Sequence, residues 1–303
     1  MKAGTDAPRP GGGPAGPLLS FHVTVRGAAH LRQGRECQDF SGCARMGEAA
    51  AAAVADGHGD IRYFRSALGS RFAVESALEA VRALMKCGGA CAGRADAEDE
   101  MAQLKKNVIL KWNHKVRRHL RGHPFLEEEL VPLSEGRRTR LCRGEDAESA
   151  YGTTLIAAAV APEFWFGLQI GDGDCVAGMG DGSLRTVPKE EGLAGNWTTS
   201  LCEPDAIDKF HHLFSRERPV SVALTTDGVR NSFSSEEYYI SFIRKVIDAF
   251  AERKLLRTRR ELEAFLREMT RRGSGDDLSV AGLIDGAALP VLPPSGGSAS
   301  FPG

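Results

Sequence analysis

Apolar, strand-like runs of this chain repeatedly meet an aspartate that stands beside a glycine. The aspartates at these junctions are Asp56, Asp172, Asp227 and Asp276, and a fifth, Asp39, follows shortly after the first apolar run. Glycine lets the backbone approach a ligand closely, and strand ends lie at the rim of a sheet. We therefore expect these residues to gather several carboxylates at one edge of a sheet.

A cluster of carboxylates requires a cation. Carboxylates within a few ångströms of one another cannot all stay ionised at neutral pH unless positive charge neutralises them. An all-oxygen set of ligands suits hard ions such as Mg2+ or Mn2+ rather than zinc. A single Asp-Gly pair is most often a turn, and Asp181-Gly182 is predicted to be a hairpin turn. The five junctions together favour a divalent metal centre.

The elements that must position these aspartates are strands in groups and helices in pairs. Apolar patterns predict strands at 21–26, 49–55, 153–160, 163–170, 174–179, 183–187, 219–226 and 278–284, with those between 153 and 187 in one antiparallel meander. Helical spacing predicts helices at 63–86, 101–121, 235–253 and 258–272. The charged stretch 134–150 is expected to be irregular. This grouping favours α+β layers over a doubly wound sheet.

One folded unit is expected, at residues 19–285. The segments 1–18 and 286–303 are rich in Gly, Pro, Ala and Ser. Such segments cannot bury enough apolar surface to offset the entropy lost on ordering. They are therefore predicted to be disordered tails on either side of a single domain.

Composition limits the class of protein. The 303 residues carry 39 Lys and Arg against 40 Asp and Glu, so the chain lacks the positive field that binding to nucleic acid or anionic membranes usually needs. No apolar run is long enough to span a bilayer. Seven scattered cysteines fit reduced thiols, and no secretion signal is evident. We expect a cytoplasmic protein with no nucleic-acid or membrane partner.

An ordered set of short motifs resembles the metal-dependent protein phosphatases of the type 2C (PPM) family, in their bacterial stand-alone form. The matching segments, in order, are Gln38-Asp39, Asp56-Gly57-His58-Gly59, Gly152-Thr153-Thr154, Gly171-Asp172, Thr226-Asp227-Gly228 and Asp276-Asp277-Leu278-Ser279. Each piece alone is weak evidence, but the ordered set spans roughly residues 21–285. The resemblance implies a four-layer α-β-β-α sandwich of two antiparallel sheets flanked by helix pairs.

The resemblance also implies an activity, namely hydrolysis of phosphoserine and phosphothreonine by a water that bridges two Mn2+ or Mg2+ ions. A metal pair lowers the pKa of bound water and neutralises charge during in-line attack on phosphorus. The implied substrates are phosphorylated proteins, the targets of a protein kinase. The target protein, the choice between Mn2+ and Mg2+, and the oligomeric state do not follow from the sequence.

The resemblance assigns roles to the metal ligands one by one. Asp56 bridges both ions, and the Gly57 carbonyl binds one of them. Asp227 and Asp276 match the ligands of one ion, and Asp39 reaches the cluster mainly through metal-bound water. Asp172 helps to hold a third, weaker ion.

His58 matches the residue that protonates the leaving alkoxide. An imidazole can donate a proton near neutral pH. The alternative is a histidine that is merely hydrogen-bonded in a turn. The four-residue match favours catalysis for His58, together with Asp56 as the bridging carboxylate.

Two positions depart from the pattern of many family members. Gln38 stands where they have a glutamate, which removes one carboxylate near the metals and could weaken ion affinity. Asp277 stands where they have an asparagine.

The arginine that binds phosphate in many family members is also missing from its usual position. The family places an arginine five residues before the first aspartate, where this chain has Gly34, with His30, Arg32 and Arg35 nearby. Arg35 is the preferred candidate, because a guanidinium binds phosphate bidentately, and His30 is the second. A solvent-facing loop arginine is the alternative for Arg35.

Two other functions stay open. A catalytically weak relative could use the same sandwich to bind a partner, although a binding module gains nothing from an unneutralised carboxylate cluster. A metal-dependent hydrolase of small phosphate esters would differ only in its substrate.

Overall fold

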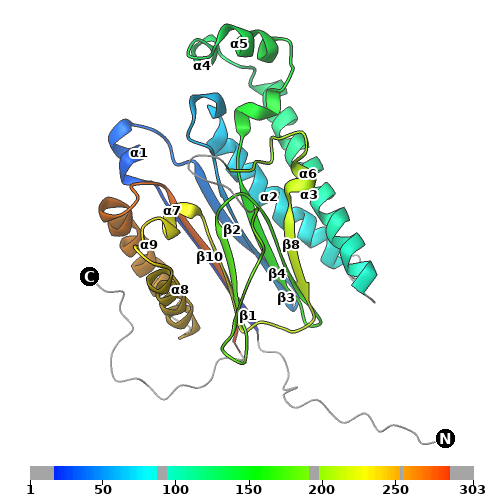
Figure 1. Cartoon of the computed structure of the whole chain (residues 1–303), viewed down its shortest axis with the longest axis vertical. Helices are drawn as coiled ribbons and strands as arrows, with labels where there is room; N and C mark the ends of the chain where they lie inside the picture. Colours follow the sequence, from blue (N-terminus) through cyan, green and yellow to red (C-terminus); the bar gives the residue numbers. More distant parts are fainter. Residues whose placement is uncertain (1–16, 87–93, 191–197, 253–254, 287–303) are drawn as a thin grey trace, which may run out of the picture.

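Two five-stranded antiparallel sheets form the centre of the molecule in this computed structural model (Figure 1). The structure describes residues 17–86, 94–190, 198–252 and 255–286, so most of the two predicted tails, 1–18 and 286–303, lies outside it. The first sheet has the order β1 (Leu18–Val25), β10 (Leu278–Asp285), β9 (Ser221–Thr225), β6 (Asp174–Gly178), β7 (Leu184–Thr186). The second has the order β2 (Asp39–Met46), β3 (Ala49–Asp56), β4 (Leu155–Val160), β5 (Trp165–Ile170), β8 (His211–Ser215).

A pair of long helices covers the outer face of each sheet. Helices α2 (Ser66–Lys86) and α3 (Arg94–Gly122) pack on the second sheet, and α8 (Glu236–Ala251) and α9 (Leu255–Arg272) pack on the first (Figure 1). A third apolar cluster fills the space between the sheets. The predicted α+β sandwich of four layers is therefore confirmed.

Strand β3 shows how the layers come together. Seven of its eight residues are alanine or valine, and both of its faces are buried. Ala50, Ala52 and Val54 face the other sheet, while the alternate alanines face the helices. Alanine has a poor intrinsic strand preference, but its small side chain lets a helix and a sheet both approach closely. Burial on both faces therefore decides the conformation.

Three sequence predictions need correction. The strands between 153 and 187 do not form one meander, because β4 and β5 belong to the second sheet and β6 and β7 to the first. Strands β2 and β8 were not predicted, since β2 mixes glycine and polar residues and β8 is a half-buried edge strand. The stretch 134–150 is not irregular throughout, because it contains α5 (Glu135–Cys142) and the beginning of the 3-10 turn η2 (Ala147–Tyr151).

The short helices lie at one end of the sandwich. They are α1 (Ala28–Gln33), α4 (Glu127–Leu130), α6 (Ala206–Lys209), α7 (Asp227–Arg230) and the 3-10 turn η1 (Ile61–Tyr63). Helices α4 and α5 project from the molecule (Figure 1) and share a small apolar cluster of Leu130, Leu133 and Leu141. Among the helices in the described ranges, none is long and apolar enough to cross a membrane.

Candidate metal centre

Asp39 and Asp56 are direct cross-strand partners at one edge of the second sheet. Asp39 begins β2 and Asp56 ends β3, and the register places the two residues opposite each other. The next residue, Gly57, donates its N–H to the Gln38 carbonyl at 3.0 Å. A Cβ at Gly57 would lie 2.6 Å from the Ser66 carbonyl oxygen, so only glycine allows this approach.

The Gly152-Thr153-Thr154 segment holds the main chain of Asp56. Thr154 donates its N–H to the Asp56 carbonyl at 2.8 Å and accepts the Asp56 N–H on Oγ1 at 3.0 Å. The Thr153 hydroxyl donates to the same carbonyl at 2.9 Å. These threonines therefore fix the main chain of Asp56 at the end of β3.

The first sheet brings its aspartates to the same edge. Asp227 follows β9 and begins α7, and Asp276 comes two residues before β10, the antiparallel neighbour of β9. A Cβ at Gly228 would lie 2.4 Å from the Asp277 carbonyl oxygen, so a glycine is required for the two segments to lie this close. The predicted gathering of carboxylates therefore draws on both sheets.

Asp172 lies where the chain crosses from β5 in one sheet to β6 in the other. Gly171 has φ +108°, and the Gln169 amide donates to the Gly173 carbonyl at 2.6 Å. Lys189 donates to the Asp172 carbonyl at 3.0 Å and pairs with Asp174 at 2.6 Å. Lys189 was not identified from the sequence, because no short-range pattern relates it to this loop.

The electrostatics show that these carboxyl groups interact. Burial and the charge of Asp277 raise the pKa of Asp39. Burial, followed by the charges of Asp39 and Asp227, raises the pKa of Asp56. Burial and the charge of Asp172 raise the pKa of Asp227 to about 6, and burial raises that of Asp276. The repulsion that the sequence predicts is therefore present.

Unpartnered oxygens mark the same place. Asp39 Oδ2 accepts a hydrogen bond from the Thr226 hydroxyl at 2.8 Å, but among the described residues its buried Oδ1 and the buried Oδ1 of Asp227 have no hydrogen-bond partner. Within the described ranges, no group of three or more His, Cys, Asp or Glu side chains is arranged so that it could hold a metal ion. The chemistry of the donors nevertheless fits a hard divalent ion, because they are buried carboxylate oxygens that lack a partner and carry raised pKa values.

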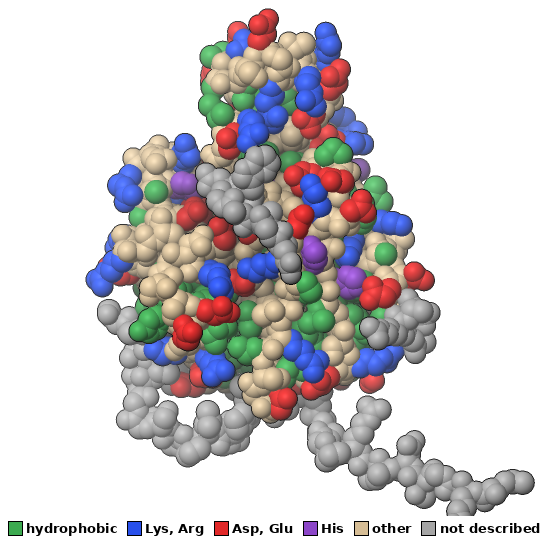
Figure 2. Space-filling model, viewed as in Figure 1, with side chains coloured by type: hydrophobic (Ala, Val, Ile, Leu, Met, Phe, Trp, Pro, Cys, Tyr) green, Lys and Arg blue, Asp and Glu red, His purple; other side chains and the backbone are tan. Residues whose placement is uncertain are grey.

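Figure 2 shows acidic side chains gathered beside α1 on this face of the molecule. The sequence matches the protein phosphatase 2C family over residues 26–267. The chain belongs to this family. Comparison of the sequence with curated proteins gives no match.

Solved bacterial phosphatases share the fold of this 2C-family chain. Serine/threonine phosphatase Stp1 from Staphylococcus aureus has a TM-score of 0.55 at 13% identity, covering 88% of this chain and 94% of Stp1. The catalytic domain of PstP, solved with two manganese ions, has 0.51 at 17%, covering 88% and 97%. PppA from Pseudomonas aeruginosa, described as a regulatory component of T6SS, has 0.52 at 17%, covering 89% and 98%.

His58 of this 2C-family chain is held beside the cluster. Its N–H donates to the Gly152 carbonyl at 3.1 Å, and its ring meets the Tyr63 ring edge-on at a centroid distance of 4.7 Å. Burial and then the charge of Arg62 lower the pKa of His58 to about 4. The imidazole is therefore neutral at pH 7 in this structure. Proton donation by His58 stays a prediction, and it requires the negative charge of a substrate phosphate to raise this pKa.

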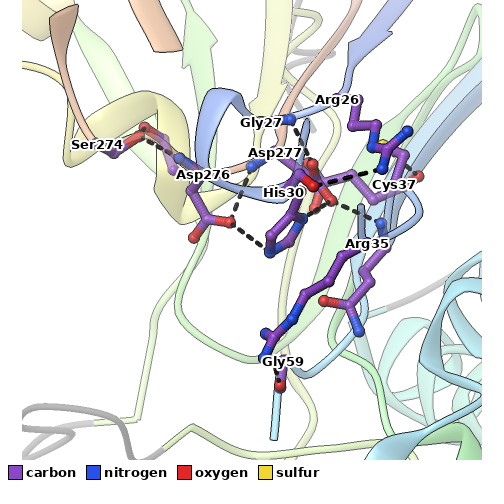
Figure 3. A network of polar contacts seen from close by, with 12 residues as sticks. Arg26, Gly27, His30, Arg35, Cys37, Gly59, Ser274, Asp276 and Asp277 are labelled. Atoms are coloured by element: carbon purple, nitrogen blue, oxygen red, sulfur yellow. Dashed lines mark hydrogen bonds and ion pairs between the residues drawn. The ribbon is translucent and has the colours of Figure 1, made fainter. Parts of the chain in front are cut away.

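The candidate phosphate-binding residues of this family member face in different directions (Figure 3). Arg35 is exposed and donates from Nη1 to the Gly59 carbonyl at 3.4 Å, across the site from its own segment. His30 is 12% exposed, and its Nδ1 lies 3.0 Å from Asp277 Oδ2. Arg35 is therefore free to meet a ligand beside the His58 turn, whereas His30 faces a carboxylate.

The amide of Gln38 uses its donor capacity. Its Nε2 donates to the His58 carbonyl at 3.2 Å and to the Ser66 hydroxyl at 2.6 Å. A carboxylate at this position could not donate to the carbonyl. The departure from the family's glutamate therefore has a local structural reason.

Proposed function

We propose that this chain is a protein serine/threonine phosphatase that hydrolyses phosphoserine and phosphothreonine at a dinuclear Mn2+ or Mg2+ site. The observation that carries the proposal is the convergence of buried carboxyl groups from both sheets. The charges of Asp39 and Asp227 raise the pKa of Asp56, and the Thr226 hydroxyl next to Asp227 donates to Asp39 Oδ2 at 2.8 Å. Carboxyl groups gathered in this way need a shared proton or a cation. The membership in the 2C family supports the cation.

Six residues would hold the metals. They are Asp39, Asp56, the Gly57 carbonyl, Asp227 and Asp276 for the pair, and Asp172 for a third, weaker ion. The ions, when bound, would lower the pKa of a coordinated water and neutralise charge on the phosphoryl group.

The chain's own residues then have separate tasks. Arg35 binds the substrate phosphate and orients it, because its guanidinium can reach across to the Gly59 turn. His58 holds a proton for the leaving hydroxyl group. The carboxylates act as ligands only, and the Thr153-Thr154 segment holds the main chain of Asp56 in place.

The test compares substrates and two aspartate variants. Phosphate release from a phosphothreonine peptide, a phosphotyrosine peptide and a small aryl phosphate is measured with and without Mn2+. We expect the phosphothreonine peptide to be the best substrate and Asp227→Asn to lower kcat by at least about a hundredfold. Asp181→Asn, in the exposed hairpin turn, is the matched control.

The two rival functions give different results. A binding module would bind the phosphothreonine peptide without releasing phosphate. A hydrolase of small esters would turn over the aryl phosphate faster than either peptide. Full activity in excess EDTA would contradict the metal-dependent mechanism itself.

A further inference from the structure

One buried carboxylate, that of Asp277, binds both ends of the segment that links the two sheets. Residues 27–38 run from the end of β1 to the start of β2 and include α1. Asp277 is 2% exposed, and its Oδ1 accepts the Gly27 N–H at 2.5 Å while its Oδ2 accepts the Gln38 N–H at 2.6 Å. The first and last residues of the segment are therefore held by the same side chain. Figure 3 shows Asp277 between Gly27 and His30.

His30 pairs with this carboxylate from inside the segment. Its Nδ1 lies 3.0 Å from Asp277 Oδ2, and its Nε2 lies 4.0 Å from Asp276 Oδ1. Only 12% of the His30 side chain is exposed. A buried carboxylate beside several others needs hydrogen-bond donors and a partner of opposite charge. Asp277 has two main-chain donors, and the His30 ring lies at ion-pair distance without a hydrogen bond from Nδ1.

Main-chain contacts hold the same segment against the 275–277 turn. Ala29 donates its N–H to the Gly275 carbonyl at 2.8 Å, and Ala28 donates to the Thr270 hydroxyl at 3.0 Å. A Cβ at Gly27 would lie 2.5 Å from the Asp276 carbonyl carbon. The segment and the turn are packed with no room for a side chain between them.

The position of Arg35 depends on this anchoring. Helix α1 ends at Gln33 and is followed by Gly34 with φ +68°, and Arg35 donates its N–H back to the His30 carbonyl at 2.9 Å. Such a left-handed cap fixes the direction in which the chain leaves the helix. His30 contacts Asp277 through its ring, and Arg35 is hydrogen-bonded to His30 through its main chain. The position of the Arg35 guanidinium therefore depends on the Asp277 carboxylate.

We propose that Asp277 and His30 are a positioning pair that staples the 27–38 segment to the acidic centre and so places Arg35 for the substrate phosphate. The part about phosphate rests on the proposed function, whereas the staple does not. An asparagine at 277 would offer one oxygen and an NH2 group, so one of the two main-chain N–H groups would lose its acceptor. The carboxylate is therefore required for both ends to be held.

The first experiment measures kinetics of the full chain at saturating Mn2+ on a phosphothreonine peptide. We expect Asp277→Asn to raise KM by about tenfold with kcat changed less than about threefold. Arg35→Ala should raise KM by about tenfold in the natural chain but add little in the Asp277→Asn background. His30→Asn, which leaves the carboxylate in place, should act in the same direction and serves if Asp277→Asn does not fold.

Asp285→Asn is the matched control. Asp285 is also a buried aspartate of the β10 region, at the far end of the strand, and it pairs with Arg218 at 2.8 Å. We expect this variant to lower stability and to leave KM unchanged. A tenfold rise of KM in Asp285→Asn would show that general loosening of β10 explains the effect, which would overturn the positioning role.

The second experiment needs no activity. Hydrogen exchange of the Gly27 and Gln38 amides is followed by NMR in the metal-free protein, and we expect exchange at least about tenfold faster in Asp277→Asn and unchanged in Asp285→Asn. Unchanged exchange in Asp277→Asn would overturn the staple. Faster exchange with additive effects of Asp277→Asn and Arg35→Ala on KM would overturn the link to Arg35. If the natural chain released no phosphate, the proposed function would fail and the exchange rates alone would decide the staple.

Discussion

Asp39 Oδ2 accepts a hydrogen bond from the Thr226 hydroxyl at 2.8 Å, which joins the start of β2 in the second sheet to the residue after β9 in the first. The residue next to Thr226 is Asp227, and the charges of Asp39 and Asp227 both raise the pKa of Asp56. This gathering of carboxyl groups is unfavourable at neutral pH unless a proton or a cation neutralises it. It gives the candidate metal centre a thermodynamic signature that can be measured apart from catalysis.

Asp227→Asn should stabilise the metal-free protein. The substitution removes the Asp227 carboxyl group, whose pKa is raised to about 6 by burial and by the charge of Asp172. At pH 7.5 we therefore expect the free energy of unfolding to rise by about 1 kcal/mol and Tm to rise by roughly 2–4 °C. The rise in Tm on adding Mn2+ should shrink in the same variant. Thermal unfolding with EDTA and with Mn2+ measures both effects. A lower metal-free Tm together with an undiminished Mn2+ effect would exclude Asp227 as a ligand.

The effect of Mn2+ on Tm should grow with pH. Asp39, Asp56 and Asp227 have raised pKa values, so the folded metal-free state binds protons more tightly than the unfolded state. Their stabilising contribution is complete below about pH 4 and is lost as the pH rises through the folded pKa, about 6 for Asp227. Protons and Mn2+ compete for the same oxygens. Tm differences with and without Mn2+ at pH 5.0 and pH 7.5 measure this, and equal differences would argue against the site.

Gln38→Glu should destabilise the metal-free protein by about 1–2 kcal/mol. The new carboxylate cannot donate to the His58 carbonyl, which Gln38 Nε2 now does at 3.2 Å, and it adds charge beside the cluster. Urea unfolding in EDTA measures the change. Gln103→Glu, on the exposed face of α3, is the control and should change stability by less than about 0.5 kcal/mol. Equal effects of the two substitutions would mean that the Gln38 amide has no structural role.

Arg65→Met should detach the α4–α5 projection. The guanidinium is 7% exposed, pairs with both Glu129 oxygens at 2.7 Å and donates to the Tyr151 hydroxyl at 2.8 Å. Because the Glu129 side chain is 24% exposed and can be rehydrated, we expect a loss of about 2–3 kcal/mol, less than for a fully buried pair. Urea unfolding and proteolysis within residues 123–146 measure the loss. Arg71→Met, from an exposed pair with Glu75 on α2, should stay within about 0.5 kcal/mol, and a similar loss there would contradict a special role for Arg65.

The gathering of aspartates could be predicted because its signal is local. Four of them, Asp56, Asp172, Asp227 and Asp276, stand next to a glycine beside an apolar run, and the structure places Asp39, Asp56, Asp227 and Asp276 where their charges interact. Their role as metal ligands stays a prediction. Strands that come in groups and helices that come in pairs predicted α+β layers, and the resemblance to the type 2C family implied that there are four of them. The grouping itself depends only on simple periodicity along the chain.

Features that depend on distant partners were missed. Helix α5 lies in a highly charged stretch and is fixed by the Leu130, Leu133 and Leu141 cluster, which no periodic pattern reveals. The orientation of His30 depends on Asp277, which is far away in the chain. Lys189 donates to the Asp172 carbonyl, a contact that forms only once the chain has folded. Roles set by such pairs become visible only when the two sheets are in place.

The division of the aspartates between the two sheets also has a mechanical consequence. Asp39 and Asp56 belong to the second sheet, and Asp227 and Asp276 to the first. Movement of one sheet relative to the other would pull these carboxylates apart. An ion held by carboxylates of both sheets would therefore cross-link the two sheets. Bound metal should therefore slow global unfolding and raise the force needed to open the two halves, beyond any local ordering of loops.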